Sequence, residues 1–243
     1  MTPVIISSLA IIVFAALIHA SFQLSVSVLT LLSGHSLGKK TAHRKVLRLI
    51  NSFLCGAFLI TALFISASVY YLSLLINHVA KTEQLVASVT CGLMVGLGIA
   101  TWAFYYRRGN GTALWLPRGF ADYLSKRSKA TKSSAEAFAL GLTSVIAELL
   151  FIIGPLLTAT LAIITLPTIE WRLIGILLYL IISMLSLLII AGLVGSGHSI
   201  ARLQKWRVAH KRFLQFTAGA SLIILSAFLF ADRVLGFNVY GGF

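Results

Sequence analysis

Charge is scarce in this chain. Only 11% of its 243 residues are Asp, Glu, Lys or Arg, whereas 58% are hydrophobic. Soluble domains carry about 25% charged residues, so the composition excludes an ordinary soluble core. Acidic residues are the rarest, with six against twenty Lys and Arg. The net charge of +14 does not indicate nucleic-acid binding, because no basic domain exists outside the segments that separate the apolar runs.

Cysteine is almost absent as well, and its two positions are informative. Cys55 and Cys91 fall in different apolar runs, at depths that differ by more than about 10 Å at 1.5 Å per helical residue. A disulfide requires Cα atoms within about 7 Å of each other. The sequence therefore excludes a disulfide between them, and with it a thiol relay.

Long hydrophobic runs are what the chain has in abundance. A bilayer core of about 30 Å is crossed by about 20 helical residues. We therefore expect an all-α polytopic membrane protein with six transmembrane helices. The first run holds about 31 apolar residues and must tilt, break or protrude. The six segments are 3–33, 51–76, 84–106, 135–166, 171–195 and 213–236.

The basic residues predict the orientation of these spans. Seventeen of the twenty Lys and Arg lie in the stretches 38–48, 107–132 and 202–212. The positive-inside rule places these loops in the cytoplasm and both termini outside, in a plasma membrane or cell inner membrane. Anionic lipid is an expected partner of such a basic face.

The long loop 107–134 divides the chain into two halves, 1–106 and 135–243. Within it, residues 113–124 place Leu116, Phe120, Tyr123 and Leu124 at helical spacing among basic residues. This pattern predicts either an interfacial helix or a solvated cytoplasmic linker, and both alternatives stay open.

Three spans in each half suggest internal symmetry. Because three is odd, the halves enter the membrane from opposite sides, as in transporters with a 3+3 inverted repeat and a midplane site. A competing likeness is direct: Ser-Gly-His-Ser occurs at both 33–36 and 196–199. Similar basic turns also account for that recurrence.

Glu148 is the one acidic residue in the middle of a predicted span. Ionisable groups deep in a bilayer are costly and mark functional sites. Burial favours a neutral, proton-exchanging carboxylic acid, so one hypothesis is proton coupling or the binding of a cationic group. The structural alternative is a protonated Glu bonded to Ser, Thr or backbone on a neighbouring helix.

The first span carries a polar stripe, in which His19, Gln23 and Ser27 follow one another at i, i+4 spacing. Such a stripe lines a wet cavity or joins helices, and the large Gln23 and His19 favour the cavity. No second deep His accompanies His19, so we expect no metal or haem site.

Glycine and proline predict two further features of the spans. Gly154 and Pro155 are expected to interrupt the fourth span and to turn backbone carbonyls toward the cavity. In the third span, Gly92, Gly96 and Gly98 predict close helix packing.

Two stretches carry a family resemblance. The run Ser21-Phe22-Gln23-Leu24-Ser25-Val26-Ser27-Val28, and 137–142 followed by Gly154-Pro155-Leu156-Leu157-Thr158-Ala159, resemble the six-helix superfamily of lysine-exporter-type transporters and cytochrome c biogenesis thiol carriers. Gln23 stands where the carriers have a cysteine, and both redox cysteines are absent. The resemblance implies 3+3 inverted repeats and transport, and we do not expect electrons to be the cargo.

The function expected is that of a secondary transporter, an exporter of a small solute or ion, with Glu148, Gln23, His19 and Ser27 at its site and no cofactor. The alternative is a non-transporting membrane scaffold that binds anionic lipid or a partner through its basic cytoplasmic face. An enzyme is not expected, because His19 and a nearby Ser lack an orienting third group and an oxyanion donor. The oligomeric state is left open, with a homo-oligomer as one alternative.

Overall fold

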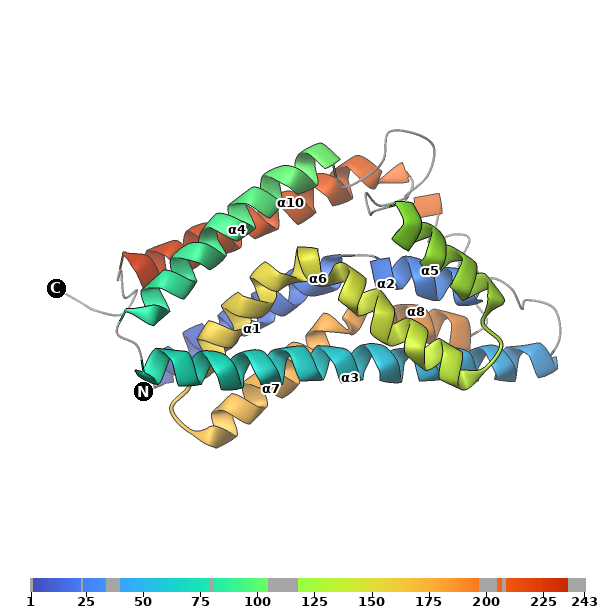
Figure 1. The fold of residues 1–243 in the computed structure, drawn as a ribbon, viewed down its shortest axis with the longest axis horizontal. Coiled ribbons are helices and arrows are strands. Elements are labelled where there is room, and N and C mark those ends of the chain that lie inside the picture. The colour runs from blue at the N-terminus through green and yellow to red at the C-terminus, as the bar shows by residue number, and fades with distance from the viewer. Residues whose placement is uncertain are drawn as a thin grey trace.

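The computed structural model describes residues 2–22, 24–33, 40–78, 81–104, 118–196, 205–206 and 209–235. Within these ranges the chain is helical and contains no strand (Figure 1), which confirms the all-α class. Five helices are long and apolar enough to cross a membrane, and six spans result if the bent pair α7–α8 counts as one.

The helices follow the predicted order of spans. Span 1 comprises α1 (Thr2–Ser21) and α2 (Leu24–Ser33), and span 5 comprises α7 (Ile169–Ser183) and α8 (Leu185–Gly195). Spans 2, 3 and 4 are α3 (Lys40–His78), α4 (Thr82–Phe104) and α6 (Ser134–Ile164). Span 6 is α10 (Lys211–Leu229) with the π-helical turn η1 (Phe230–Val234). Helix α3 begins eleven residues before the apolar run starts, so its first turns are basic.

Span 1 breaks, which is one of the three outcomes that its length allowed. Helix α1 ends at Ser21, and α2 begins at Leu24. The amide of Phe22 donates to the carbonyl of His19 (3.1 Å) as the chain turns. A straight helix over both segments would be about 48 Å long at 1.5 Å per residue, well above the hydrocarbon thickness of about 30 Å.

Span 5 is bent by 50° between Ser183 and Leu185, inside the run 171–195. The hydroxyl of Ser183 donates to the carbonyl of Leu180 (3.1 Å), one turn back. Back-bonding of this kind competes with the backbone ladder and bends helices.

The interruption expected at Gly154–Pro155 is wrong, because α6 continues through both residues to Ile164. Proline can kink a helix without ending it when neighbouring groups satisfy the backbone. Proline at position 155 removes the amide that would bond to the Phe151 carbonyl, and the helix continues past this one lost bond. The glycine serves packing instead: a Cβ at Gly154 would lie 2.5 Å from Cγ of Met94 on α4.

Helices α3 and α6 cross in close contact. A Cβ on Gly56 of α3 would overlap the backbone of Phe138, and one on Gly141 of α6 would overlap the backbone of Phe53. Each glycine therefore admits the main chain of the opposite helix, which brings the start of span 4 against span 2.

Spans 3 and 6 form a second close pair. Cys91 donates to the carbonyl of Ser226 (3.4 Å), and the Ser226 hydroxyl donates back to the Cys91 carbonyl (3.0 Å). Gly98 faces Gly219 across the same contact. The packing expected at Gly92 and Gly96 is wrong within the described residues, since a Cβ at either position meets nothing within 4 Å.

The loop between the halves contains α5 (Arg118–Ala130), which contacts α2 and α6. It begins five residues after the start of the predicted stretch 113–124 and extends six residues beyond its end. Its Leu124 is buried, whereas Tyr123 is exposed on another side of the helix. A helix is therefore present over Arg118–Ala130, and its position at a membrane interface stays a prediction.

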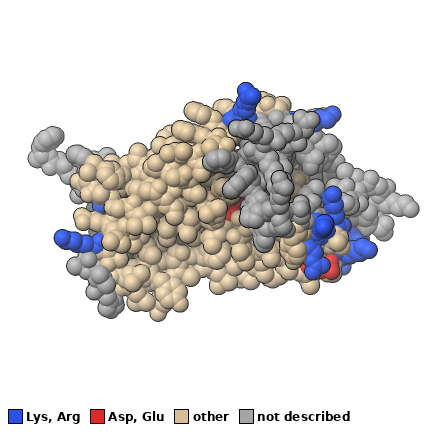
Figure 2. All heavy atoms as spheres, turned by 45° about the horizontal axis from the view of Figure 1, so that its top comes forward, with Lys and Arg blue, Asp and Glu red and all other residues tan. Residues whose placement is uncertain are grey.

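The described Lys and Arg residues are unevenly distributed along the long axis of the bundle. The start of α1, the turns after α3 and α6, and η1 lie at one end, here named the terminal end (Figure 1). The opposite end, named the basic end, carries the starts of α3, α6 and α10 and most of the described Lys and Arg, while the middle of the surface is nearly free of them (Figure 2).

Candidate functional site: a buried polar cavity at two helix breaks

Glu148 lies inside the bundle, on α6, and is only 3% exposed. Its Oε1 accepts a hydrogen bond from the backbone amide of Ser25 (2.6 Å), and its Oε2 accepts one from the Ser25 hydroxyl (2.8 Å). That hydroxyl also lies 3.2 Å from the hydroxyl of Ser144, one turn before Glu148. The carboxyl group of Glu148 thus accepts hydrogen bonds from both the backbone amide and the hydroxyl of Ser25, which lies on the facing span.

Ser25 is the second residue of α2, which explains why an acid stands opposite it. The first amides of a helix have no partner within the helix, and here they are buried among other spans. A carboxylate satisfies such an amide and is favoured by the partial positive charge of a helix N-terminus. The break in span 1 and the acid in span 4 therefore stabilise each other.

This contact bears on both hypotheses for Glu148. The structural alternative required a bond to Ser or to backbone on a neighbouring helix, and Ser25 supplies both. The functional hypothesis required a midspan acid beside polar groups, and the same contact supplies those. Its role in coupling therefore stays a prediction.

His19 stands in the last turn of α1 and is buried. Its Nδ1 shares a hydrogen bond of 2.8 Å with the hydroxyl of Tyr179 on α7, which is fully buried. Gln23 lies outside the described residues. Ser27 is half-buried on α2, beyond the break, so the stripe expected along one continuous helical face is wrong.

The breaks in spans 1 and 5 meet. The Ser186 hydroxyl, at the start of α8, donates to the carbonyl of Ala20 near the end of α1 (2.6 Å). Carbonyls at a helix C-terminus lack intrahelical partners, so a side chain from one broken span satisfies the backbone of the other.

A cavity of about 10 Å³ lies where these contacts converge. That volume is close to the space that one water-sized occupant requires. Phe22 stacks on Phe151 (ring centroids 5.6 Å apart) beside it. The polar side chains that line it come from spans 1, 2, 4 and 5: His19, Ser25, Thr61, Glu148, Ser183 and Ser186.

Sequence reasoning placed His19 and Glu148 in the site, and the structure brings both to this cavity. It missed Thr61, Ser183 and Ser186 because isolated hydroxyls in apolar helices usually bond to the preceding turn. Tyr179 carried a usable signal, since a buried Tyr hydroxyl requires a partner. Among the described residues no three His, Cys, Asp or Glu side chains gather in a way that could hold a metal ion.

A second polar network joins the spans at the terminal end. Arg233 of η1 contacts Glu83 of α4 (2.7 Å) and Asp232 (2.7 Å), and it donates to Thr165 after α6 (3.2 Å). The Thr165 hydroxyl lies 3.2 Å from that of Ser8 on α1. Ser8 precedes His19 by eleven residues, or about 16 Å of helix. This network, named the terminal clasp, links spans 1, 3, 4 and 6 on one side of the cavity.

Comparisons of the chain with protein-family models, with characterised proteins and with solved structures found no match. The site therefore has to be interpreted from its own geometry.

Proposed function

We propose that this protein is a secondary transporter, an exporter of a small solute or ion, whose site is the cavity at Glu148. The observation that carries the proposal is the meeting of two discontinuous spans at one buried acid. Backbone breaks inside a membrane are tolerated where they are buried in protein or line a cavity. In transporters, such broken helices form the midplane site.

The helix contacts support an inverted 3+3 arrangement. In such an arrangement, span 1 corresponds to span 4, span 2 to span 5 and span 3 to span 6. A contact between spans 2 and 4 therefore has its counterpart in a contact between spans 5 and 1. Both contacts exist, as α3 against α6 and as α1 against α7. The contacts α1–α6 and α4–α10 each join two corresponding spans, 1 with 4 and 3 with 6. Polar residues from both halves line the cavity, as expected for a site at a repeat interface.

Glu148 can link its own occupancy to helix position. Both of its carboxyl oxygens accept from Ser25, so a proton or a cationic group on the carboxyl competes with the N-terminus of α2. When Glu148 is occupied, its hold on α2 weakens, and when it is emptied, α2 is drawn back. A ligand that favours one of two positions shifts the population between them.

Thiol accessibility tests whether the cavity opens to water. In a Cys55→Ala/Cys91→Ala background, Ser183→Cys places a thiol at the cavity, and Ser226→Cys places a matched one in the dry contact of α4 with α10. We expect a membrane-impermeant thiol reagent to modify Ser183→Cys from at least one side of the membrane and to leave Ser226→Cys intact. Equal protection of both thiols from both sides would contradict a transport cavity and support the scaffold alternative.

Flux measurements test the coupling. Purified protein is placed in liposomes that contain a pH-sensitive dye and is exposed to gradients of amino acids and metal cations, the cargo classes that the resemblance implies. We expect one of them to drive proton movement, and Glu148→Gln to abolish that movement while the protein still assembles. Normal proton-coupled flux by Glu148→Gln would exclude Glu148 as the coupling group.

A further inference from the structure

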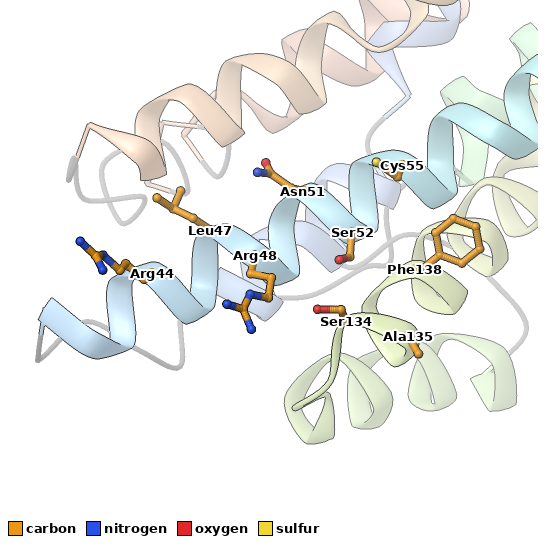
Figure 3. A pocket seen from close by; sticks show the side chains of 9 residues that line it. All are labelled: Arg44, Leu47, Arg48, Asn51, Ser52, Cys55, Ser134, Ala135 and Phe138. Carbon is orange, nitrogen blue, oxygen red and sulfur yellow. The ribbon is translucent and has the colours of Figure 1, made fainter.

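A basic groove opens at the basic end, between the first turns of α3 and the start of α6 (Figure 3). It is a shallow, open groove with a volume of about 680 Å³. Arg48 and Ser52 point from α3 toward the start of α6, where Ser134 lies, and Phe138 stands farther along α6 (Figure 3). The lining residues are Arg44, Leu47, Arg48, Asn51, Ser52, Cys55, Ser134, Ala135 and Phe138.

The mouth of the groove is positively charged, and no acidic side chain is among its described lining residues. A neighbouring hollow of about 340 Å³ shares Arg44 and Arg48 and adds Lys45 and Lys132. Among the residues described, no ion pair joins these four cations to a carboxylate. An anion at this mouth would meet several cations from two helices.

The nearest acid on α6 is already engaged. The carboxylate of Glu136 accepts from the backbone amides of Lys132 (2.9 Å) and Ser133 (3.4 Å), while the Ser133 hydroxyl accepts from the Glu136 amide (3.2 Å). This capping box fixes the start of α6. It also directs the carboxylate back toward its own helix end.

Polarity changes along the groove over a few helical turns. Arg44 and Arg48 are exposed, Asn51 and Ser52 follow on the next turn of α3, and Cys55 and Phe138 stand at the apolar end. From Arg44 to Cys55 the helix rises about 16 Å. Arg44 also begins the stretch of α3 that is apolar enough to cross a membrane. Along the groove, charged side chains are therefore followed by neutral hydroxyl and amide groups, and these are followed by apolar side chains toward the bilayer.

From this succession we infer that the groove binds one anionic phospholipid. Arg44, Arg48 and Lys132 would contact the phosphate, since guanidinium groups bind phosphate oxygens in a bidentate manner. Asn51, Ser52 and Ser134 would hydrogen-bond the glycerol and ester oxygens, and one acyl chain would lie along Cys55 and Phe138. Basic pockets between membrane helices at the headgroup level suit such lipids. A free phosphate compound would leave the apolar end of the groove unused.

Native mass spectrometry of the purified full chain tests this inference without any transport assay, so its outcome is independent of the proposed function. Phosphatidylglycerol and phosphatidylcholine of the same acyl composition are titrated in parallel. We expect tighter binding of phosphatidylglycerol, and a loss of that preference on the order of tenfold in Arg44→Gln/Arg48→Gln. The matched control Lys205→Gln/Arg212→Gln also removes two charges near the basic end and should keep the preference.

Glycerol 3-phosphate distinguishes a lipid from a free phosphate compound. We expect that a large molar excess of it leaves phosphatidylglycerol bound, because it lacks the acyl chain. Displacement at concentrations comparable to the lipid would overturn the lipid assignment in favour of a phosphate site alone. An unchanged preference in Arg44→Gln/Arg48→Gln, or an equal loss in the control, would overturn the site itself, since the attraction would then belong to the whole basic end.

Discussion

Glu148 and Ser25 face each other across the centre of the bundle, and one carboxyl group binds both the backbone amide and the hydroxyl of that serine. The two residues lie 123 positions apart in the sequence. Their contact stabilises the break in span 1, because the acid of span 4 accepts from the backbone amide at the buried start of α2. It also puts the one midspan acid where its occupancy can act on a backbone break.

The first prediction concerns the strength of this contact. Glu148→Ala removes both acceptors and leaves the buried backbone amide of Ser25 without this partner, which costs about 1–3 kcal/mol, while the Ser25 hydroxyl keeps its contact with Ser144. Glu148→Gln keeps one acceptor oxygen and should cost less. Thermal unfolding in detergent should therefore rank the chains as unaltered, Gln variant and Ala variant in falling order. Glu170→Ala is the control, since Glu170 is exposed at the start of α7; a Glu148→Ala variant as stable as this control would contradict the prediction.

The second prediction concerns the pair His19 and Tyr179. Tyr179→Phe preserves the ring and removes the hydroxyl that contacts Nδ1 of His19. The buried imidazole nitrogen loses its partner, so we expect a loss of about 1–3 kcal/mol in the free energy of unfolding. Tyr70→Phe, at an exposed tyrosine, should change stability by less than about 0.5 kcal/mol. Chemical denaturation of both variants in the same detergent measures the difference, and equal effects would show that the hydrogen bond adds no stability.

The third prediction concerns the crossing of α3 and α6. Gly141→Ala and Gly56→Ala place a methyl group against the backbone of the other helix, and backbone cannot move aside as a flexible side chain can. We expect each to lower the yield of folded protein and its melting temperature. Gly92→Ala adds the same methyl group where nothing lies within 4 Å and should leave both unchanged. Size-exclusion profiles and melting curves test this directly, and a Gly141→Ala variant that matches Gly92→Ala would argue against the close crossing.

The fourth prediction concerns the terminal clasp. Arg233→Gln removes the cation that joins Glu83 and Asp232 and weakens the link to Thr165. If spans 1, 3, 4 and 6 separate here when the cavity opens, this change should speed thiol modification of Ser183→Cys from the side that the clasp faces, by about tenfold for a shift near 1.4 kcal/mol.

Lys81→Gln serves as the control for the clasp, because Lys81 is exposed at the same end and takes no part in the network. A rate that rises equally in Lys81→Gln, or from both sides of the membrane, would indicate general loosening of the bundle. A rate that stays unchanged in Arg233→Gln would contradict a gating role for the clasp.

The family resemblance and the proposed export of a solute rest on fewer residues than the assignment of the fold does. The stretch around Gln23 that carries part of the resemblance borders the break in span 1, and the Gly154–Pro155 stretch lies within a continuous helix. What supports transport is the convergence of His19, Glu148 and Ser186 on one cavity. That convergence involves helices from both halves of the chain, and neither motif alone predicted it.

The sequence by itself determined the spans, because the requirement is one-dimensional: about 20 apolar residues cross the hydrocarbon, whatever lies beside them. Its grouping of Lys and Arg likewise separated the basic end from the end that carries the start of α1 and η1. The excess length of span 1 even required that it tilt, break or protrude. Each of these properties follows from the order of residues along the chain and does not depend on which segments pack together.

Only the tertiary structure decided where the helices break and which side chains meet. Span 4 contains the proline yet stays helical, whereas spans 1 and 5 break without one. A buried break leaves backbone amides and carbonyls without partners, so it persists where other helices bring an acceptor or donor, as Glu148 does for Ser25 and Ser186 does for Ala20. Which helices those are depends on the packing of the whole bundle.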